Sequence, residues 1–173
     1  MIREKNEKDF DYSEYTDGIW VGYRYFQTVG ADVSFPFGHG LSYTEFEYSK
    51  PVVKASADGF TATVTVTNTG KTAGKEVVQL YYTAPYTAGG IEKAHVVLGN
   101  FAKTKMLQPG ESETVTIEIT ARDMSSYDWS DANKNGFKGY ELEKGAYEIK
   151  LMKDANTVVE SFNCVVNEDI TYQ

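Results

Sequence analysis

The stretch Phe60-Thr-Ala-Thr-Val-Thr-Val-Thr67 alternates apolar and polar residues at every position. Successive side chains of a β-strand point to opposite faces of a sheet, so such a stretch presents one apolar and one polar face. The apolar face consists of Phe60, Ala62, Val64 and Val66, and four threonines make the other. The stretch therefore predicts a strand that buries one face in a core and exposes the other.

Similar strand patterns recur along most of the chain. We expect about seven strands, at residues 43–53, 60–67, 77–82, 96–101, 113–120, 146–152 and 162–166. Turn-forming residues separate them, as in Asn68-Thr-Gly70 and Gln108-Pro-Gly110. The run 77–82 is apolar at nearly every position, which is typical of a strand covered on both faces. The expected fold class is all-β, an immunoglobulin-like antiparallel β-sandwich over residues 42–166.

The first 41 residues follow a different pattern. Residues 1–18 are polar and acidic, and two dense aromatic segments follow, Ile19-Trp-Val-Gly-Tyr-Arg-Tyr-Phe26 and Phe35-Pro-Phe-Gly-His-Gly-Leu41. Neither segment alternates, and no part of the chain shows sustained helical spacing. Exposed aromatic segments of this kind mark interaction surfaces. We therefore expect an irregular N-terminal arm that packs on a partner outside this chain.

The composition excludes several classes of function. The chain has 173 residues, 17 Lys and Arg against 25 Asp and Glu, and a net charge of −8, which gives no electrostatic footprint for nucleic acid. No apolar run is long enough to cross a membrane, and residues 1–10 lack the apolar stretch of a secretory signal. These features predict a cytoplasmic protein with neither nucleic acid nor a membrane as partner. One domain is expected at this length.

Several motifs in fixed order resemble a known family. The segments Asp17-Gly-Ile-Trp-Val-Gly-Tyr-Arg-Tyr-Phe26 and Phe35-Pro-Phe-Gly-His-Gly-Leu-Ser-Tyr-Thr44 are followed by Val64-Thr-Val-Thr-Asn-Thr-Gly70, Gly74-Lys-Glu-Val-Val-Gln-Leu-Tyr81 and Leu107-Gln-Pro-Gly-Glu111. Together they resemble the part of glycoside hydrolase family 3 β-glucosidases that leads from an α/β-sandwich domain into a fibronectin type III-like domain.

This resemblance implies a division of the chain. Residues 1–41 would be an arm or linker from a preceding α/β-sandwich domain, and residues 42–166 the fibronectin type III-like β-sandwich. Residues 167–173 would begin a C-terminal linker. Residues 140–154 look like those of a subset of the family in which the sandwich precedes the catalytic barrel.

The resemblance also implies a function. The parent would be a retaining β-glucosidase, an O-glycosyl hydrolase of carbohydrate metabolism, with its aspartate nucleophile on a (β/α)8 barrel and its glutamate acid/base on the α/β-sandwich domain. Neither domain is in this sequence, so we expect a non-catalytic accessory domain that braces the catalytic domains and uses no cofactor. The expected domain-interface residues are Trp20, Tyr23, Arg24, Phe26, Phe35 and Phe37, because buried aromatic residues and arginine dominate protein contacts.

The chain offers no convincing catalytic group of its own. Glu111 and Glu113 share a strand face, but a pair beside a turn is usually a solvated surface feature. Ser42 lies in Gly40-Leu-Ser-Tyr-Thr44, which lacks the final glycine of a nucleophile elbow. His39 and His95 have no second ligand at zinc spacing.

Two further binding hypotheses stay open. Tyr82, Tyr86 and Trp129, with Tyr81 and Tyr140 nearby in sequence, could stack on sugar rings, although core packing is the ordinary role of such residues. An independent carbohydrate-binding module for oligo- or polysaccharide, or a structural adhesion or scaffold domain, is therefore an alternative function.

The second binding hypothesis concerns calcium. The stretch Asp131-Ala-Asn-Lys-Asn-Gly136 matches the first half of a calcium loop, with Asp131, Asn133 and Asn135 as candidate ligands. The twelfth position, which should supply a bidentate carboxylate, is Leu142. We favour a hairpin loop rich in Asn, Asp and Gly, and no metal.

Overall fold

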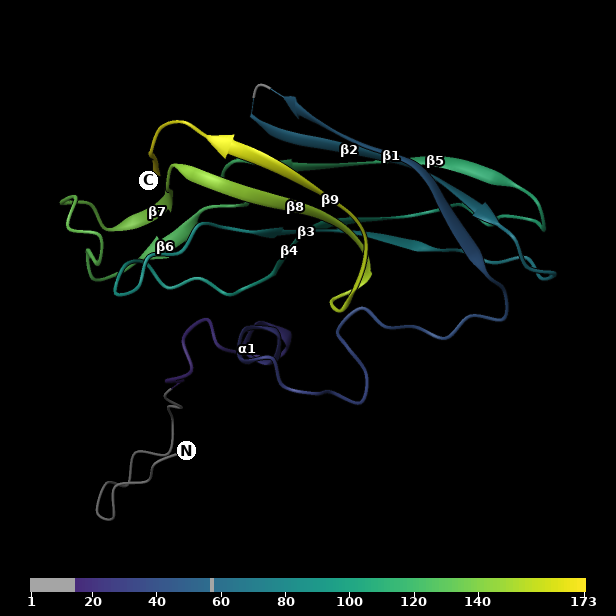
Figure 1. Cartoon of the computed structure of the whole chain (residues 1–173), viewed down its shortest axis with the longest axis horizontal. Helices are drawn as coiled ribbons and strands as arrows, with labels where there is room; N and C mark the ends of the chain where they lie inside the picture. Colours follow the sequence, from purple (N-terminus) through teal and green to yellow (C-terminus); the bar gives the residue numbers. More distant parts are fainter. Residues whose placement is uncertain (1–14, 57) are drawn as a thin grey trace, which may run out of the picture.

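Ten strands and one short helix make up the part of the chain that the computed structural model describes, residues 15–56 and 58–173 (Figure 1). Residues 1–14 of the predicted arm therefore lie outside the described residues. The elements follow in the order α1 (Tyr23–Val29), β1 (Phe46–Ser56), β2 (Gly59–Asn68), β3 (Val77–Thr83), β4 (Val97–Lys103), β5 (Ser112–Thr120), β6 (Ser126–Asp128), β7 (Gly139–Leu142), β8 (Gly145–Asp154), β9 (Thr157–Val166) and β10 (Ile170–Tyr172).

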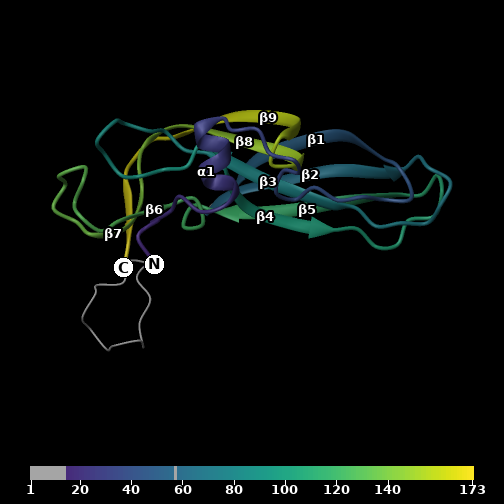
Figure 2. The same ribbon diagram turned by 90° about the horizontal axis from the view of Figure 1, so that it is seen from below.

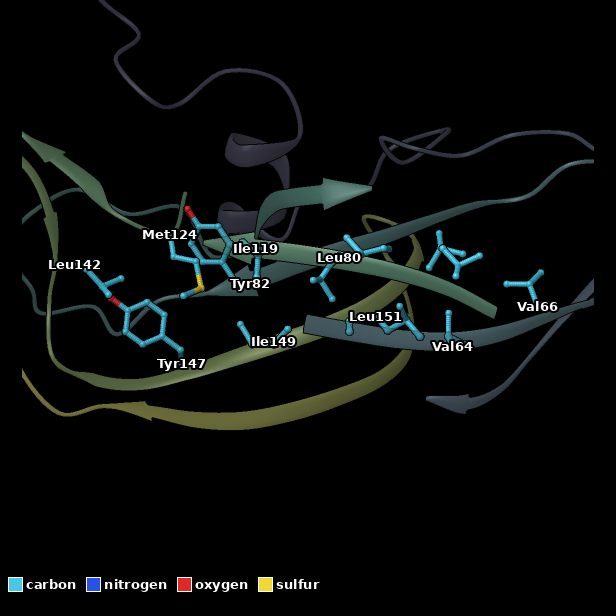
Figure 3. Close-up of a cluster of buried hydrophobic side chains, with 14 of the residues drawn as sticks. Val64, Val66, Leu80, Tyr82, Ile119, Met124, Leu142, Tyr147, Ile149 and Leu151 are labelled. Carbon is cyan, nitrogen blue, oxygen red and sulfur yellow. The ribbon is translucent and has the colours of Figure 1, made fainter. Parts of the chain in front are cut away.

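Two antiparallel sheets form the sandwich. One has the strand order β1-β2-β5 and the other β4-β3-β8-β9. Their apolar faces meet in one core, to which β2 contributes Val64, β3 Leu80, β5 Ile119 and β8 Ile149, each 1% exposed or less (Figure 3). The register pairs Val64 with Val115, so apolar residues of neighbouring strands lie side by side on the buried face. The predicted all-β sandwich is confirmed.

All seven predicted strands occur, as β1 to β5, β8 and β9. The prediction missed a small third sheet, β10-β7-β6, which Figure 1 shows with β6 and β7 beyond one end of the sandwich. Residues 167–173, predicted as a linker, contain β10, in which Ile170 pairs with Leu142 of β7. Strands of three or four residues are too short to show a period, so pairing alone reveals them.

The sequence predicted an irregular arm, but the arm contains helix α1. This seven-residue helix ends at Gly30, whose φ of 65° is left-handed, and the N–H of Ala31 bonds back to the carbonyl of Phe26 at 3.0 Å. No residue of α1 is buried. A helix without a buried stripe shows no apolar period, which is why the sequence did not predict it. No helix of the described chain is long and apolar enough to cross a bilayer.

Strand β3 is covered on both faces, as predicted. Leu80 and Tyr82 point into the sandwich core, whereas Gln79 and Tyr81 point the other way and are also buried. The arm supplies this second cover, and Figure 2 shows α1 lying over the sheet that contains β3 and β8.

A half-buried carboxyl just before β3 gives a pH-dependent prediction. Tyr48 of β1 donates a 2.9 Å hydrogen bond to Oε1 of Glu76. Burial raises the pKa of Glu76, although this bond and the positive charge of Lys153 oppose the rise. The folded chain thus retains a proton that the unfolded chain has already lost, so the free energy of unfolding falls as the pH rises through this interval.

We expect Glu76→Gln to remove this fall, because glutamine still accepts a hydrogen bond from Tyr48 but cannot ionise. Urea unfolding from about pH 4 to about pH 7 measures the effect. The two proteins should be similar in stability below the ordinary glutamate pKa of 4.5, and the variant should gain relative to the wild type above it. Parallel pH profiles would contradict the assignment.

Candidate functional site

The arm is anchored to the outer face of the β4-β3-β8-β9 sheet by Tyr23. The Tyr23 ring stacks on Phe37 with centroids 4.6 Å apart, and it packs edge-on against Tyr81 at 6.1 Å. Its hydroxyl oxygen accepts a 2.8 Å hydrogen bond from the N–H of Leu98. Tyr81 is fully buried beneath these contacts. The helix therefore places one aromatic side chain of the arm inside this domain.

A second anchor holds the segment around Phe37. The N–H of Ala155 donates a 2.8 Å bond to the Phe37 carbonyl, and the Gln79 amide donates to the carbonyl of Gly38 at 3.3 Å. Gly38 has a φ of +83°, and a Cβ there would come within 2.2 Å of Oε1 of Gln79. Only glycine allows this close approach without strain.

Three side-chain contacts outside these anchors complete the attachment of the arm. Thr28 accepts a 2.9 Å bond from the N–H of His95, and Gln27 bonds to Asn156. The indole N–H of Trp20 reaches Glu92 at 3.5 Å. The arm is thus part of the folded domain.

The arm carries several apolar side chains that the described chain leaves exposed. Their exposed fractions reach 71% at Phe35, 94% at Leu41 and 97% at Tyr43, and 42% at Phe26. We call this set the outer arm face, and it also includes Val21, Tyr25 and Val29. Exposed apolar surface concentrated on one segment marks an interaction site.

The structure divides the six predicted interface residues into two groups. Phe26 and Phe35 lie on the outer arm face, whereas Tyr23 packs on its own sandwich and Trp20 is half-buried. Phe37 does both, since its ring stacks on Tyr23 and remains 49% exposed. Arg24 projects from α1 into a cavity. Sequence reasoning missed Leu41 and Tyr43, which stood in the quoted motif but were not singled out.

A cavity of about 550 Å³ lies beside the arm. Ile19 and Arg24 line it from the arm, and Tyr127 and Tyr140 line it from the small sheet. These two tyrosine rings form an edge-on pair with centroids 5.0 Å apart. The cavity therefore lies between the arm and the β10-β7-β6 sheet.

The predicted sugar-stacking residues do not form one platform. Tyr82 is 5% exposed in the sandwich core and donates to the carbonyl of Asp123, so the prediction is wrong for this residue. Tyr81 is buried under the arm. Tyr86 and Trp129 are exposed by 62% and 72%, but within residues 15–56 and 58–173 neither ring pairs with another aromatic ring.

The candidate calcium loop is arranged around an acid. Asn133 and Asn135 direct their amide N–H groups to Oε2 of buried Glu141, at 3.0 and 2.6 Å. The Asp131 carboxylate accepts the N–H of Gly136 at 3.0 Å. The side-chain oxygens of Asn133 and Asn135 accept the backbone N–H groups of Asn135 and Phe137, at 3.2 and 2.8 Å, so these candidate ligands serve the loop itself. The described residues also bring no three His, Cys, Asp or Glu side chains together, so the geometry favours the hairpin loop.

The acidic pair Glu111 and Glu113 is engaged with the neighbouring turn. Glu111 forms a 2.8 Å ion pair with Lys105, whose ammonium holds the pKa of Glu111 below its ordinary value. Glu113 accepts the backbone N–H of Lys105 at 2.8 Å. Ser42 accepts the N–H of Thr44, as a turn residue does. These contacts favour structural roles for the residues that resembled catalytic motifs.

The sandwich with its docked arm defines a class of protein, a fibronectin type III-like domain. The Fibronectin type III-like domain family matches residues 76–155. Over 162 residues the chain is 49% identical to β-glucosidase A of Butyrivibrio fibrisolvens, and this match covers 83% of the chain and 19% of the relative. It is 47% identical to a β-glucosidase of Ruminococcus albus, over 92% of the chain and 16% of the relative.

Solved structures agree with these relatives. The structure of β-glucosidase 3B from Thermotoga neapolitana in complex with α-D-glucose matches with a TM-score of 0.80 and 38% identity, over 92% of this chain and 21% of that one. A β-glucosidase from Paenibacillus barengoltzii matches with a TM-score of 0.79 and 42% identity, over 88% and 17%. The chain thus belongs to the fibronectin type III-like domains of glycoside hydrolase family 3 β-glucosidases, and it spans about a fifth of these relatives.

Proposed function

We propose that this chain is the non-catalytic accessory domain of a family 3 glycoside hydrolase, and that the outer arm face docks it against the catalytic domains. The parent would hydrolyse β-glucosidic bonds with retention. The observation that carries the proposal is an arm that is both anchored and exposed. Tyr23 fixes the arm to its own sandwich, while Phe35, Leu41 and Tyr43 of the arm remain uncovered.

Two further observations support a role without catalysis. Retaining hydrolysis requires two carboxyl groups about 5–5.5 Å apart, one as nucleophile and one as proton donor. The pair that the sequence suggested, Glu111 and Glu113, is bound to Lys105 at an exposed turn. The relatives are also about five times longer than the matched region, which leaves room for separate catalytic domains.

The test uses a family 3 β-glucosidase from which the matched region has been deleted, with this chain added as a separate protein. We expect the two to associate, and Phe35→Ser to weaken the association about tenfold, since loss of an aromatic anchor costs more than about 1 kcal/mol. Calorimetry measures binding, and hydrolysis of an aryl β-glucoside reports function. Phe35 is 71% exposed, so the variant should keep its fold.

The matched control is Tyr86→Ser, which removes a ring of similar exposure far from the arm in sequence. It should bind as the wild type does. The proposal fails if both variants bind equally well, or if the purified chain alone hydrolyses the glucoside faster than a heat-inactivated sample.

A further inference from the structure

Both arginines of the described chain line the same cavity. The sequence contains three arginines, of which Arg3 lies outside the described residues. Arg24 enters the 550 Å³ cavity from α1, and Arg122 enters it from the turn after β5. The lining also includes Lys93, Glu92 and Asp123.

The other charged groups of the cavity already have partners. Asp123 accepts both the N–H and the hydroxyl of Thr120, at 3.0 and 2.6 Å. Glu92 accepts the indole N–H of Trp20, and Lys93 is ion-paired to Glu143. No described carboxylate lies within ion-pair distance of either arginine.

Tyr82 and Tyr172 contact the surroundings of the two arginines. The Tyr82 hydroxyl donates a 3.2 Å bond to the carbonyl of Asp123, the residue after Arg122. Burial raises the pKa of Tyr82 to about 12, and the nearby positive charge of Arg24 opposes this rise. Tyr82 lines the cavity together with both arginines. The Arg122 guanidinium is also held 5.9 Å from the centre of the Tyr172 ring.

We propose that this cavity receives an Asp or Glu side chain from the domain against which the arm packs, and that Arg24 and Arg122 bind its carboxylate. The guanidinium fork matches the two oxygens of a carboxylate and stays charged at every working pH. This inference rests on the proposed function, because the docking domain supplies the acid.

The position of the cavity selects a protein side chain as the occupant. Arg24 projects from the same helix that carries Tyr25, Phe26 and Val29 of the outer arm face. The cationic site therefore lies next to the helix that carries part of the surface that we propose as the interface. A buried ion pair beside apolar anchors fixes the register of two proteins as well as their affinity.

The first test measures carboxylate binding directly. Sodium propionate, which mimics a glutamate side chain, is titrated into the chain at constant ionic strength, and the Nε–H resonances of both arginines are followed by NMR. We expect saturable shifts of both resonances. Arg24→Gln or Arg122→Gln should weaken the binding about tenfold, as expected for loss of a hydrogen bond to a charged group. Neutral propionamide is the matched ligand and should cause no such shifts.

Several outcomes of this titration would overturn the proposal. Shifts that do not saturate, that propionamide reproduces, or that persist in the Gln variants would do so. So would saturation by D-glucuronate at concentrations where propionate has no effect, because the occupant would then be an anionic sugar. Arg122→Lys keeps the charge without the fork, and it should bind propionate more weakly than the wild type.

The second test uses the deleted β-glucosidase described above. The double variant Arg24→Gln/Arg122→Gln should associate at least about tenfold more weakly, whereas Lys54→Gln, an exposed residue of the other sheet, should associate normally. If Phe35→Ser weakens association and the arginine variant does not, the carboxylate site is refuted and the proposed function stands. If the wild-type chain does not associate at all, the carboxylate site and the proposed function are both refuted.

Discussion

Replacing Tyr81 with alanine is expected to lower the free energy of unfolding by about 3–5 kcal/mol, the range for removal of a buried aromatic side chain. Tyr81 is fully buried on the outer side of β3, in a cluster with Val96, Met152 and Ala155. Tyr23 packs edge-on against its ring. The substitution therefore leaves a cavity beneath the arm and removes the surface on which the arm lies.

The loss should be concentrated in the attachment of the arm. Hydrogen exchange can show this, because the amides of Leu98 and Ala155 donate to Tyr23 and Phe37 of the arm. We expect these two amides to lose protection beyond the global loss of stability. Urea unfolding gives the global value. In the trans assay the variant should also bind the deleted glucosidase more weakly, since the outer arm face would no longer be fixed.

Tyr81→Phe is the control for this prediction. It removes only the hydroxyl, which donates a 2.8 Å bond to Gln79, and should cost about 1 kcal/mol while the arm stays docked. An exposed tyrosine provides the other comparison, because Tyr127→Ala should change stability little. If Tyr81→Ala were as mild as Tyr127→Ala, the arm would not depend on this contact.

The sandwich could be predicted from the sequence because its strands are long enough to show their period. The stretch 60–67 alternates, and Ala62, Val64 and Val66 of its apolar face are buried in the structure, whereas its threonines are not. The apolar run 77–82 also predicted that β3 is covered twice. The run could not show which segment covers the outer face of β3. Tyr81 meets a helix that lies more than fifty residues earlier in the chain and has no buried stripe.

The candidate site was harder to predict. Tyr23 and Phe26 stand three residues apart in one aromatic segment, yet Tyr23 packs on Tyr81 whereas Phe26 remains 42% exposed. Composition cannot separate them, since the direction of each side chain is set by α1 and by the Leu98 amide that binds Tyr23. Arg24 was expected at the domain interface. Arg122 was not, because only the folded chain brings the two into one cavity.

The calcium candidates make contacts that spacing cannot reveal. The residues at alternate positions carry oxygens, as a calcium loop requires. Asparagine also carries two amide N–H donors, and in this loop they point inward to Glu141. Glu141 lies on β7, in the small sheet whose short strands the sequence did not predict.

Asn68→Ala is expected to destabilise the domain by about 3 kcal/mol. Asn68 is completely buried at the end of β2, where its oxygen accepts the Thr44 hydroxyl at 2.6 Å and the Gly70 N–H at 3.1 Å. Its amide donates to the carbonyls of Thr72 and Leu107, at 2.8 and 2.9 Å. Alanine leaves these partners without a bond in the interior, where each unsatisfied group costs about 1–3 kcal/mol unless water replaces the amide.

This network matters to the arm because Thr44 is where the arm enters β1. The Tyr23 cluster holds the arm at one end, and Asn68 holds it at the other. Urea unfolding of Asn68→Ala, Thr44→Val and the double variant gives a double-mutant cycle. We expect the double variant to lose about 1 kcal/mol less unfolding free energy than the sum of the two single losses. Full additivity would mean that the bond between the two side chains contributes nothing. Protection of the Thr69 amide, which donates to Glu45 at 2.9 Å, should fall in both single variants, since this bond lies beside the missing side chains and closes the junction between arm and sandwich.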